Sequence, residues 1–77
     1  MEVKTKYLVS LMEEYLENMC AYLSTNCRPL FYYYAGKADA IRDVLENYFY
    51  WDSESANDHI KAMWDIMDEN WVQEGNE

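Results

Sequence analysis

Apolar residues recur every three or four positions along the first third of the chain, from Leu8 to Leu23. This spacing places them on one face of an α-helix, with acidic and small polar residues on the other face. Thr5 precedes the repeat and suits an N-cap, because its hydroxyl can accept a hydrogen bond from a free amide of the first turn. The pattern predicts a helix over about residues 5–25. Its apolar positions are Leu8, Leu11, Met12, Tyr15, Leu16, Met19, Tyr22 and Leu23.

A second helical register runs from Pro29 to Tyr50. Pro29 suits the first turn of a helix, where its missing amide hydrogen needs no partner. The register passes through Gly36, which costs about 1 kcal/mol relative to alanine inside a helix. One continuous helix bent at Gly36 and two shorter helices joined there are therefore alternatives. The apolar positions of this register are Leu30, Tyr34, Ala38, Ile41, Leu45 and Tyr48.

Residues that favour helix caps separate this segment from the last apolar repeat. Ser55, with Asp58 three positions later, resembles a capping box, although glutamate or glutamine is the usual partner. A polar tail over residues 73–77 is expected to fray. Between the capping residues and this tail, a third apolar repeat predicts a helix. Its apolar face consists of Ile60, Met63, Trp64, Met67 and Trp71.

The overall composition agrees with this helical pattern. Two glycines and one proline are too few for a turn-rich β-sandwich or barrel, and 51% hydrophobic residues suffice for a packed core. We predict an all-α fold, a single domain over residues 1–77, with three helices or four if the second breaks at Gly36. The bundle is either antiparallel or orthogonal. A chain of this length has a modest core, and its stability is marginal unless it oligomerises.

The net charge is the feature of the sequence that bears most on function. Fifteen acidic against six basic side chains give a charge of −9, on a chain that also carries eight tyrosines and three tryptophans. This charge repels nucleic acid and anionic membranes and favours a basic partner. The lysines and arginines form no basic patch along the sequence, so direct binding of DNA or RNA is not expected.

Carboxylates occur in four pairs spaced four residues apart. A helix places each pair on one face, with about 5–6 Å between Cβ atoms, close to the spacing of about 6–7 Å between successive phosphates of a strand. These pairs indicate either a surface that imitates nucleic acid or an ordinary solvated face. They are Glu13 and Glu17, Asp39 and Asp43, Glu54 and Asp58, and Asp65 and Glu69.

Consecutive aromatic residues cannot all face the core of one helix, because neighbours point about 100° apart. The run from Phe31 to Tyr34 and the run from Tyr48 to Trp51 must therefore leave rings on the surface. Such rings are either contacts for an arginine-rich partner or covers for a small core or homodimer seam. The residues that we expect to bind a partner are Asp39, Asp43, Glu46, Asp65, Asp68 and Glu69, with Tyr32, Tyr33 and Tyr50 as aromatic anchors.

Catalytic and metal chemistry has little support in the sequence. His59 is the only histidine, and it has neither a nucleophile nor a second ligand at a known motif spacing, so we interpret it as a surface residue at a helix end. Cys20 and Cys27 form no Cys-x-x-Cys pair. We expect no enzyme activity, no metal and no cofactor. Without a secretion signal or an apolar run of about 18 residues, we expect a cytoplasmic protein with reduced thiols.

In size, acidity and aromatic content the chain resembles small phage- or plasmid-encoded inhibitors such as anti-CRISPR and anti-restriction proteins. Its charge favours an inhibitor that occupies the basic nucleic-acid-binding surface of a target protein, in the cytoplasm of the host cell if phage-encoded. One alternative is an immunity protein or antitoxin that neutralises a basic toxin. Another is a helical structural protein that forms homo-oligomers, a homodimer among them, through its surplus aromatic residues.

Overall fold

A computed structural model describes the backbone of residues 3–75 and the side chains of residues 3–71. Helix α1 spans Val3–Ser24, α2 spans Arg28–Tyr48 and α3 spans Asp58–Gly75, with a short 3₁₀ helix, η1, at Ser53–Ser55. No strand occurs within these residues, so the predicted all-α fold with three main helices is confirmed. Within the same part of the chain, none of the helices has the length and apolar character that a membrane span requires.

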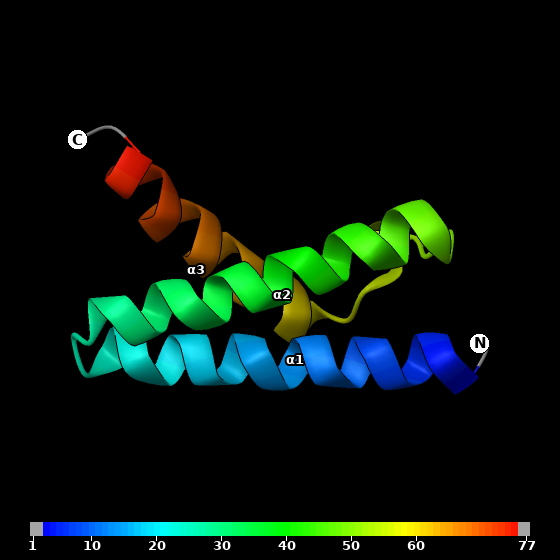
Figure 1. The fold of residues 1–77 in the computed structure, drawn as a ribbon, viewed down its shortest axis with the longest axis horizontal. Coiled ribbons are helices and arrows are strands. Elements are labelled where there is room, and N and C mark those ends of the chain that lie inside the picture. The colour runs from blue at the N-terminus through cyan, green and yellow to red at the C-terminus, as the bar shows by residue number, and fades with distance from the viewer. Residues whose placement is uncertain (1–2, 76–77) are drawn as a thin grey trace.

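The helices form an antiparallel pair crossed by a third. Helices α1 and α2 run antiparallel, joined by a tight turn; they lie close together at the turn and diverge toward the end of α2 (Figure 1). A longer connection leads from the end of α2 back to the middle of the molecule, where α3 begins and crosses the pair obliquely (Figure 1). The result is an elongated molecule of 38 × 22 × 20 Å.

One hydrophobic core joins all three helices. The apolar repeats predicted for the first and third helices supply most of it, so those registers are confirmed for all their positions except Leu11 and Tyr22, which are not part of this core. Two small residues, Ala35 and Ala38, line the core side of α2 and allow its backbone to approach the neighbouring helix closely. The buried side chains are Met12, Leu16, Met19, Phe31, Ala35, Ala38, Leu45, Ile60, Met63, Trp64 and Met67.

The first helix begins earlier than the sequence predicts. Thr5 lies inside α1 instead of capping it, and its side chain is only 6% exposed. The expected N-cap at Thr5 is therefore wrong.

The buried face of α2 differs from the predicted register in its first half. Phe31 and Ala35 are buried, whereas Leu30 is 38% exposed and Tyr34 only half-buried. Tyr48, which the register also placed in the core, is exposed. Several adjacent apolar residues at 30–34 allow more than one register, and the larger Phe31 ring takes the core position.

Helix α2 continues without a break through Gly36, so the fourth helix that the sequence left open does not form. A Cβ atom added at Gly36 would meet no atom within 4 Å, and the residue does not adopt a positive φ. We therefore expect Gly36→Ala to raise the free energy of unfolding by about 0.5–1 kcal/mol in urea denaturation. The exposed Ala40→Gly on the same helix should lower it by a similar amount. A loss of stability in Gly36→Ala would contradict an open, unstrained site.

Helix α1 ends in a turn that needs one residue with positive φ. The amide of Cys27 donates to the carbonyl of Tyr22 at 2.8 Å, and Asn26, between them, has φ 61°. This is the hydrogen-bond pattern of a Schellman motif, in which glycine is the usual residue and asparagine the common substitute. Asn26 therefore suits its position.

Helix α2 is also followed by a residue with positive φ, a less suitable one, but its closing hydrogen bond spans six residues and not the five of a Schellman motif. The amide of Trp51 donates to the carbonyl of Leu45 at 2.9 Å, and Tyr50 has φ 54°. The left-handed conformation costs an ordinary side chain roughly 1–2 kcal/mol, because Cβ comes too close to a carbonyl oxygen. A glycine at position 50 would therefore be more stable than the tyrosine. Tyr50 is also 88% exposed.

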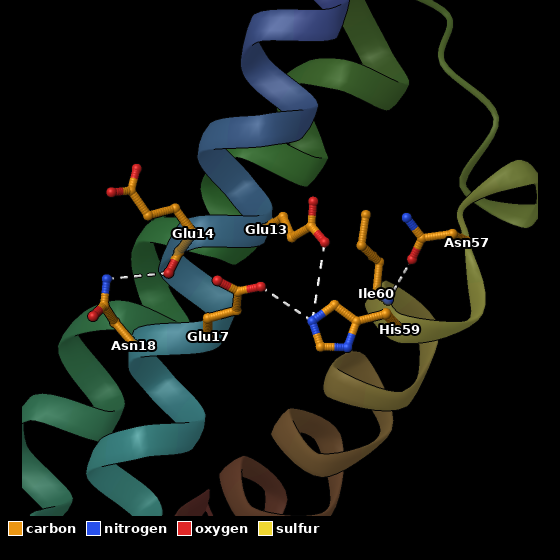
Figure 2. Close-up of polar contacts among 7 residues, drawn as sticks. All are labelled: Glu13, Glu14, Glu17, Asn18, Asn57, His59 and Ile60. Carbon is orange, nitrogen blue, oxygen red and sulfur yellow. Dashed lines mark hydrogen bonds and ion pairs between the residues drawn. The ribbon is translucent and has the colours of Figure 1, made fainter.

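The third helix is capped by a residue other than the one predicted. The side-chain oxygen of Asn57 accepts a hydrogen bond from the Ile60 amide at 2.9 Å (Figure 2), as an N-cap does. Ser55 instead closes η1, where its hydroxyl lies 3.4 Å from the Asp52 carboxylate. The expected Ser55–Asp58 capping box is therefore wrong. Helix α3 reaches Gly75, well into the predicted tail, while residues 76–77 lie outside the described part.

Candidate functional site

The carboxylates of residues 3–71 have few basic side chains close to them. Among the side chains of residues 3–71, no lysine or arginine nitrogen lies within 4.0 Å of a carboxylate oxygen, and the two ion pairs present both involve His59. Arg42 and Glu46, which are four residues apart on α2, are therefore not an ion pair. The negative charge is therefore available to a partner, since an exposed carboxylate without an internal counter-ion is free to pair with one from outside.

Two basic side chains lie over aromatic rings instead of pairing with carboxylates. The Lys37 ammonium is 4.9 Å from the ring centroid of Tyr33 and 5.6 Å from that of Tyr15. The Arg42 guanidinium is 4.8 Å from the ring centroid of Trp64, which joins α2 to α3. Such cation–π contacts stabilise the fold by about 0.5–1 kcal/mol at exposed sites and leave the acids unpaired.

A hollow of about 310 Å³ opens between α2, η1 and α3. It lies at the Arg42–Trp64 contact and is lined mostly by charged side chains of both signs. Its volume is at the lower end of small-ligand sites, and its polar lining differs from their usual apolar one. The lining residues are Arg42, Ser53, Glu54, Lys61, Trp64, Asp65 and Asp68.

The predicted acidic residues of α2 share one face of that helix. Their spacing places Asp39, Asp43 and Glu46 within about 60° of one another around the helix axis, together with Tyr32. Asp43 is exposed and accepts a hydrogen bond from the Asn47 side-chain amide at 2.8 Å. Asp39 and Glu46 are half-buried, and they are helical neighbours of Arg42, which lies toward α3.

The predicted acidic residues of α3 are all exposed. Asp65 and Asp68 line the hollow beside Arg42, so the structure brings them to the side of α2 that carries Asp39 and Glu46. Glu69 lies one turn from Asp65 and is not part of the hollow. The acidic surface below denotes Asp39, Asp43, Glu46, Asp65, Asp68 and Glu69.

The three predicted aromatic anchors are in different surroundings. Tyr32 shares the α2 face of the acidic surface and is half-buried, with its ring 5.0 Å from that of Phe31. Tyr33 lies about 120° away from Asp39 around α2; it is 54% exposed, with the Lys37 ammonium over its ring. Tyr50 is exposed beyond the end of α2. The structure therefore separates Tyr33 from the acidic surface, while the surroundings of Tyr32 and Tyr50 leave their predicted role untested.

A second cluster joins α1 to α3 (Figure 2). His59, the second residue of α3, has Nε2 3.1 Å from a Glu17 carboxylate oxygen and 4.0 Å from a Glu13 oxygen. His59 and Glu17 are exposed, and Glu13 is half-buried. The sequence predicted a surface histidine but not its partners, because these residues are 42 positions away or more and no local motif connects them.

The surroundings of Cys20 do not favour a reactive thiol. Both thiols are free, and Cys20 is half-buried on α1. Burial raises the pKa of the Cys20 thiol, and the nearby charge of Glu17 raises the pKa further. A raised pKa keeps the sulfur protonated at neutral pH, so Cys20 is unsuited to act as a nucleophile.

Comparisons of the chain with models of protein families, with curated proteins and with solved structures find no match. The functional interpretation therefore depends on the charges, contacts and exposed side chains of the molecule itself. Of these, the acidic surface and the exposed aromatic rings bear most directly on a binding partner.

Proposed function

We propose that the protein is an inhibitor that binds the basic nucleic-acid-binding surface of a target protein. The observation that carries this proposal is the lack of internal lysine or arginine partners for the carboxylates of residues 3–71. Like charges held four residues apart on a helix are destabilising, so such an arrangement costs the free protein stability. A basic partner would remove that repulsion on binding.

The acidic surface and Tyr50 have different roles in this proposal. Opposite charge steers the two proteins together and raises the association rate, most strongly at low salt. Aromatic rings buried on contact supply the larger share of affinity, because they bring much apolar area at little entropic cost. Tyr50 is the ring best placed for this, since at 88% it is the most exposed aromatic residue in the described part of the chain.

A trade-off between stability and binding is expected at Tyr50. Tyr50→Gly removes a strained left-handed residue and should raise the free energy of unfolding by about 1 kcal/mol. It also removes an exposed ring and should weaken binding to the target by about 2 kcal/mol, near thirtyfold. Thermal unfolding and a titration against the captured target measure the two effects separately.

Asn26→Gly is the matched control for this variant, because Asn26, at the end of α1, has a similar positive φ. Asparagine tolerates that conformation better than tyrosine, so the control should gain only a few tenths of a kcal/mol and bind the target as the parent does. Unchanged binding in Tyr50→Gly would exclude Tyr50 from the interface.

The experiment that tests the proposed function is capture of the target with the tagged protein from extract of its source cells, washed at low and high salt. A basic nucleic-acid enzyme that is retained at low salt and displaced by added DNA supports the proposal. Capture of a toxin that does not act on nucleic acid would support an immunity protein instead. Recovery of the protein alone would contradict both.

One observation favours the homo-oligomer as a second candidate. The start of α1 and the end of α2 form an apolar hollow of about 440 Å³, lined by Val3, Lys4, Tyr7, Leu8 and Phe49. Its rim includes exposed apolar side chains, as contact surfaces often do. Sedimentation at high protein concentration distinguishes the two candidates. A strict monomer would exclude the homo-oligomer, whereas the proposed inhibitor function does not depend on the oligomeric state.

A further inference from the structure

We propose that Glu13, Glu17 and His59 form a binding site for a divalent transition metal of the zinc type. The side chains come from two helices that are far apart in sequence, and they converge on one point (Figure 2). This site lies between α1 and α3, and it shares no residue with the acidic surface. It is therefore independent of the proposed inhibitory function.

The distances suit a tetrahedral metal after small movements of exposed side chains. One ligand atom from each residue lies within 4.8 Å of the other two. With metal–ligand bonds of about 2.0–2.2 Å, tetrahedral ligand atoms are about 3.3–3.6 Å apart. The distances from His59 Nε2 to the two glutamates, 3.1 Å and 4.0 Å, lie on either side of that range.

The chemistry of the three ligands selects the kind of metal. Calcium and magnesium bind oxygen ligands, whereas an imidazole nitrogen with two carboxylates is typical of zinc and its neighbours in the first transition series. Three protein ligands leave a fourth position, which water would occupy. The spacing of Glu13 and Glu17, one helical turn apart, holds both carboxylates toward the same ion.

The charges at this cluster also favour a cation with more than one positive charge. Within residues 3–71, the His59 imidazole is the only basic group within 4.0 Å of either carboxylate. Even a protonated imidazole neutralises only one of the two glutamates. A divalent ion would neutralise both, while the neutral imidazole supplies the third ligand.

The test is a titration of the whole protein with zinc chloride in a buffer that does not chelate metals, followed by calorimetry and NMR. His59 is the only histidine, so its ring resonances report on this site alone. We expect these resonances to shift on addition of zinc but not of magnesium. Glu17→Gln and His59→Gln should each weaken binding at least tenfold, since loss of supporting residues alone costs about 10–100-fold.

Two controls separate this site from other sources of zinc binding. Glu14→Gln removes an exposed carboxylate from the same turn of α1 and should leave binding unchanged, because Glu14 lies outside the cluster. A protein with Cys20→Ala and Cys27→Ser should still bind. Ring resonances that do not respond to zinc, or equal binding by Glu17→Gln and the parent, would overturn the proposal and leave the cluster as an ion pair only.

Discussion

Replacing Phe31 by alanine should destabilise the protein by about 3–5 kcal/mol. The Phe31 side chain is fully buried at 0% exposure and is among the largest in the core. Its removal forfeits the transfer free energy of the ring and leaves a cavity that a helix pair can close only in part. Proteins of this size are stable by roughly 4–12 kcal/mol in total. We therefore expect the variant to lose most of its stability and to be largely unfolded if the parent lies at the lower end of this range. Urea denaturation followed by circular dichroism measures the loss.

Leu30→Ala is the matched control, because Leu30 adjoins Phe31 and the sequence placed it in the core. The structure leaves it 38% exposed, so its truncation should cost less than about 1 kcal/mol. A larger loss in Leu30→Ala than in Phe31→Ala would restore the register predicted from the sequence. The two variants thus decide which face of α2 is buried.

The sequence predicted the helices better than their contacts. Helical periodicity is unambiguous where polar residues separate the apolar ones, as around Leu16 in α1 and Met67 in α3, and both are buried. It fails where apolar residues are consecutive, as they are around Phe31, because several faces are then equally apolar. Packing against α1 decides among those faces, and that information is not local.

The candidate sites could be predicted only in part for the same reason. The exposure of Asp65 follows from its place opposite the apolar stripe of α3. The position of Arg42 over Trp64, however, depends on how α3 crosses α2. The meeting of His59 with Glu17 depends on the same crossing, so a search for ligands three or four residues apart cannot find it. The conformation of Tyr50 was equally inaccessible, because tyrosine does not favour positive φ.

Reversing two charges on the acidic surface should reduce binding to the captured target by at least about a hundredfold. Asp65→Lys with Glu69→Lys replaces attraction by repulsion at two exposed positions one turn apart on α3, for a loss of about 3 kcal/mol.

Lysine favours helices at least as well as the residues that it replaces, so circular dichroism should show the parent helicity. Because exposed charges are screened by salt, the difference in affinity between variant and parent should shrink as ionic strength rises.

A control of equal charge separates a local contact from a general effect of net charge. Asp65→Lys and Glu14→Lys change the net charge equally, and both side chains are exposed on helices, but Glu14 lies on α1 outside the acidic surface. If the acidic surface binds the target, Asp65→Lys should weaken affinity well beyond Glu14→Lys at the same salt concentration. Equal losses would mean that the target senses only overall charge. Binding by both variants as tight as that of the parent would remove electrostatics from the interaction altogether, and the carboxylates would then serve solubility.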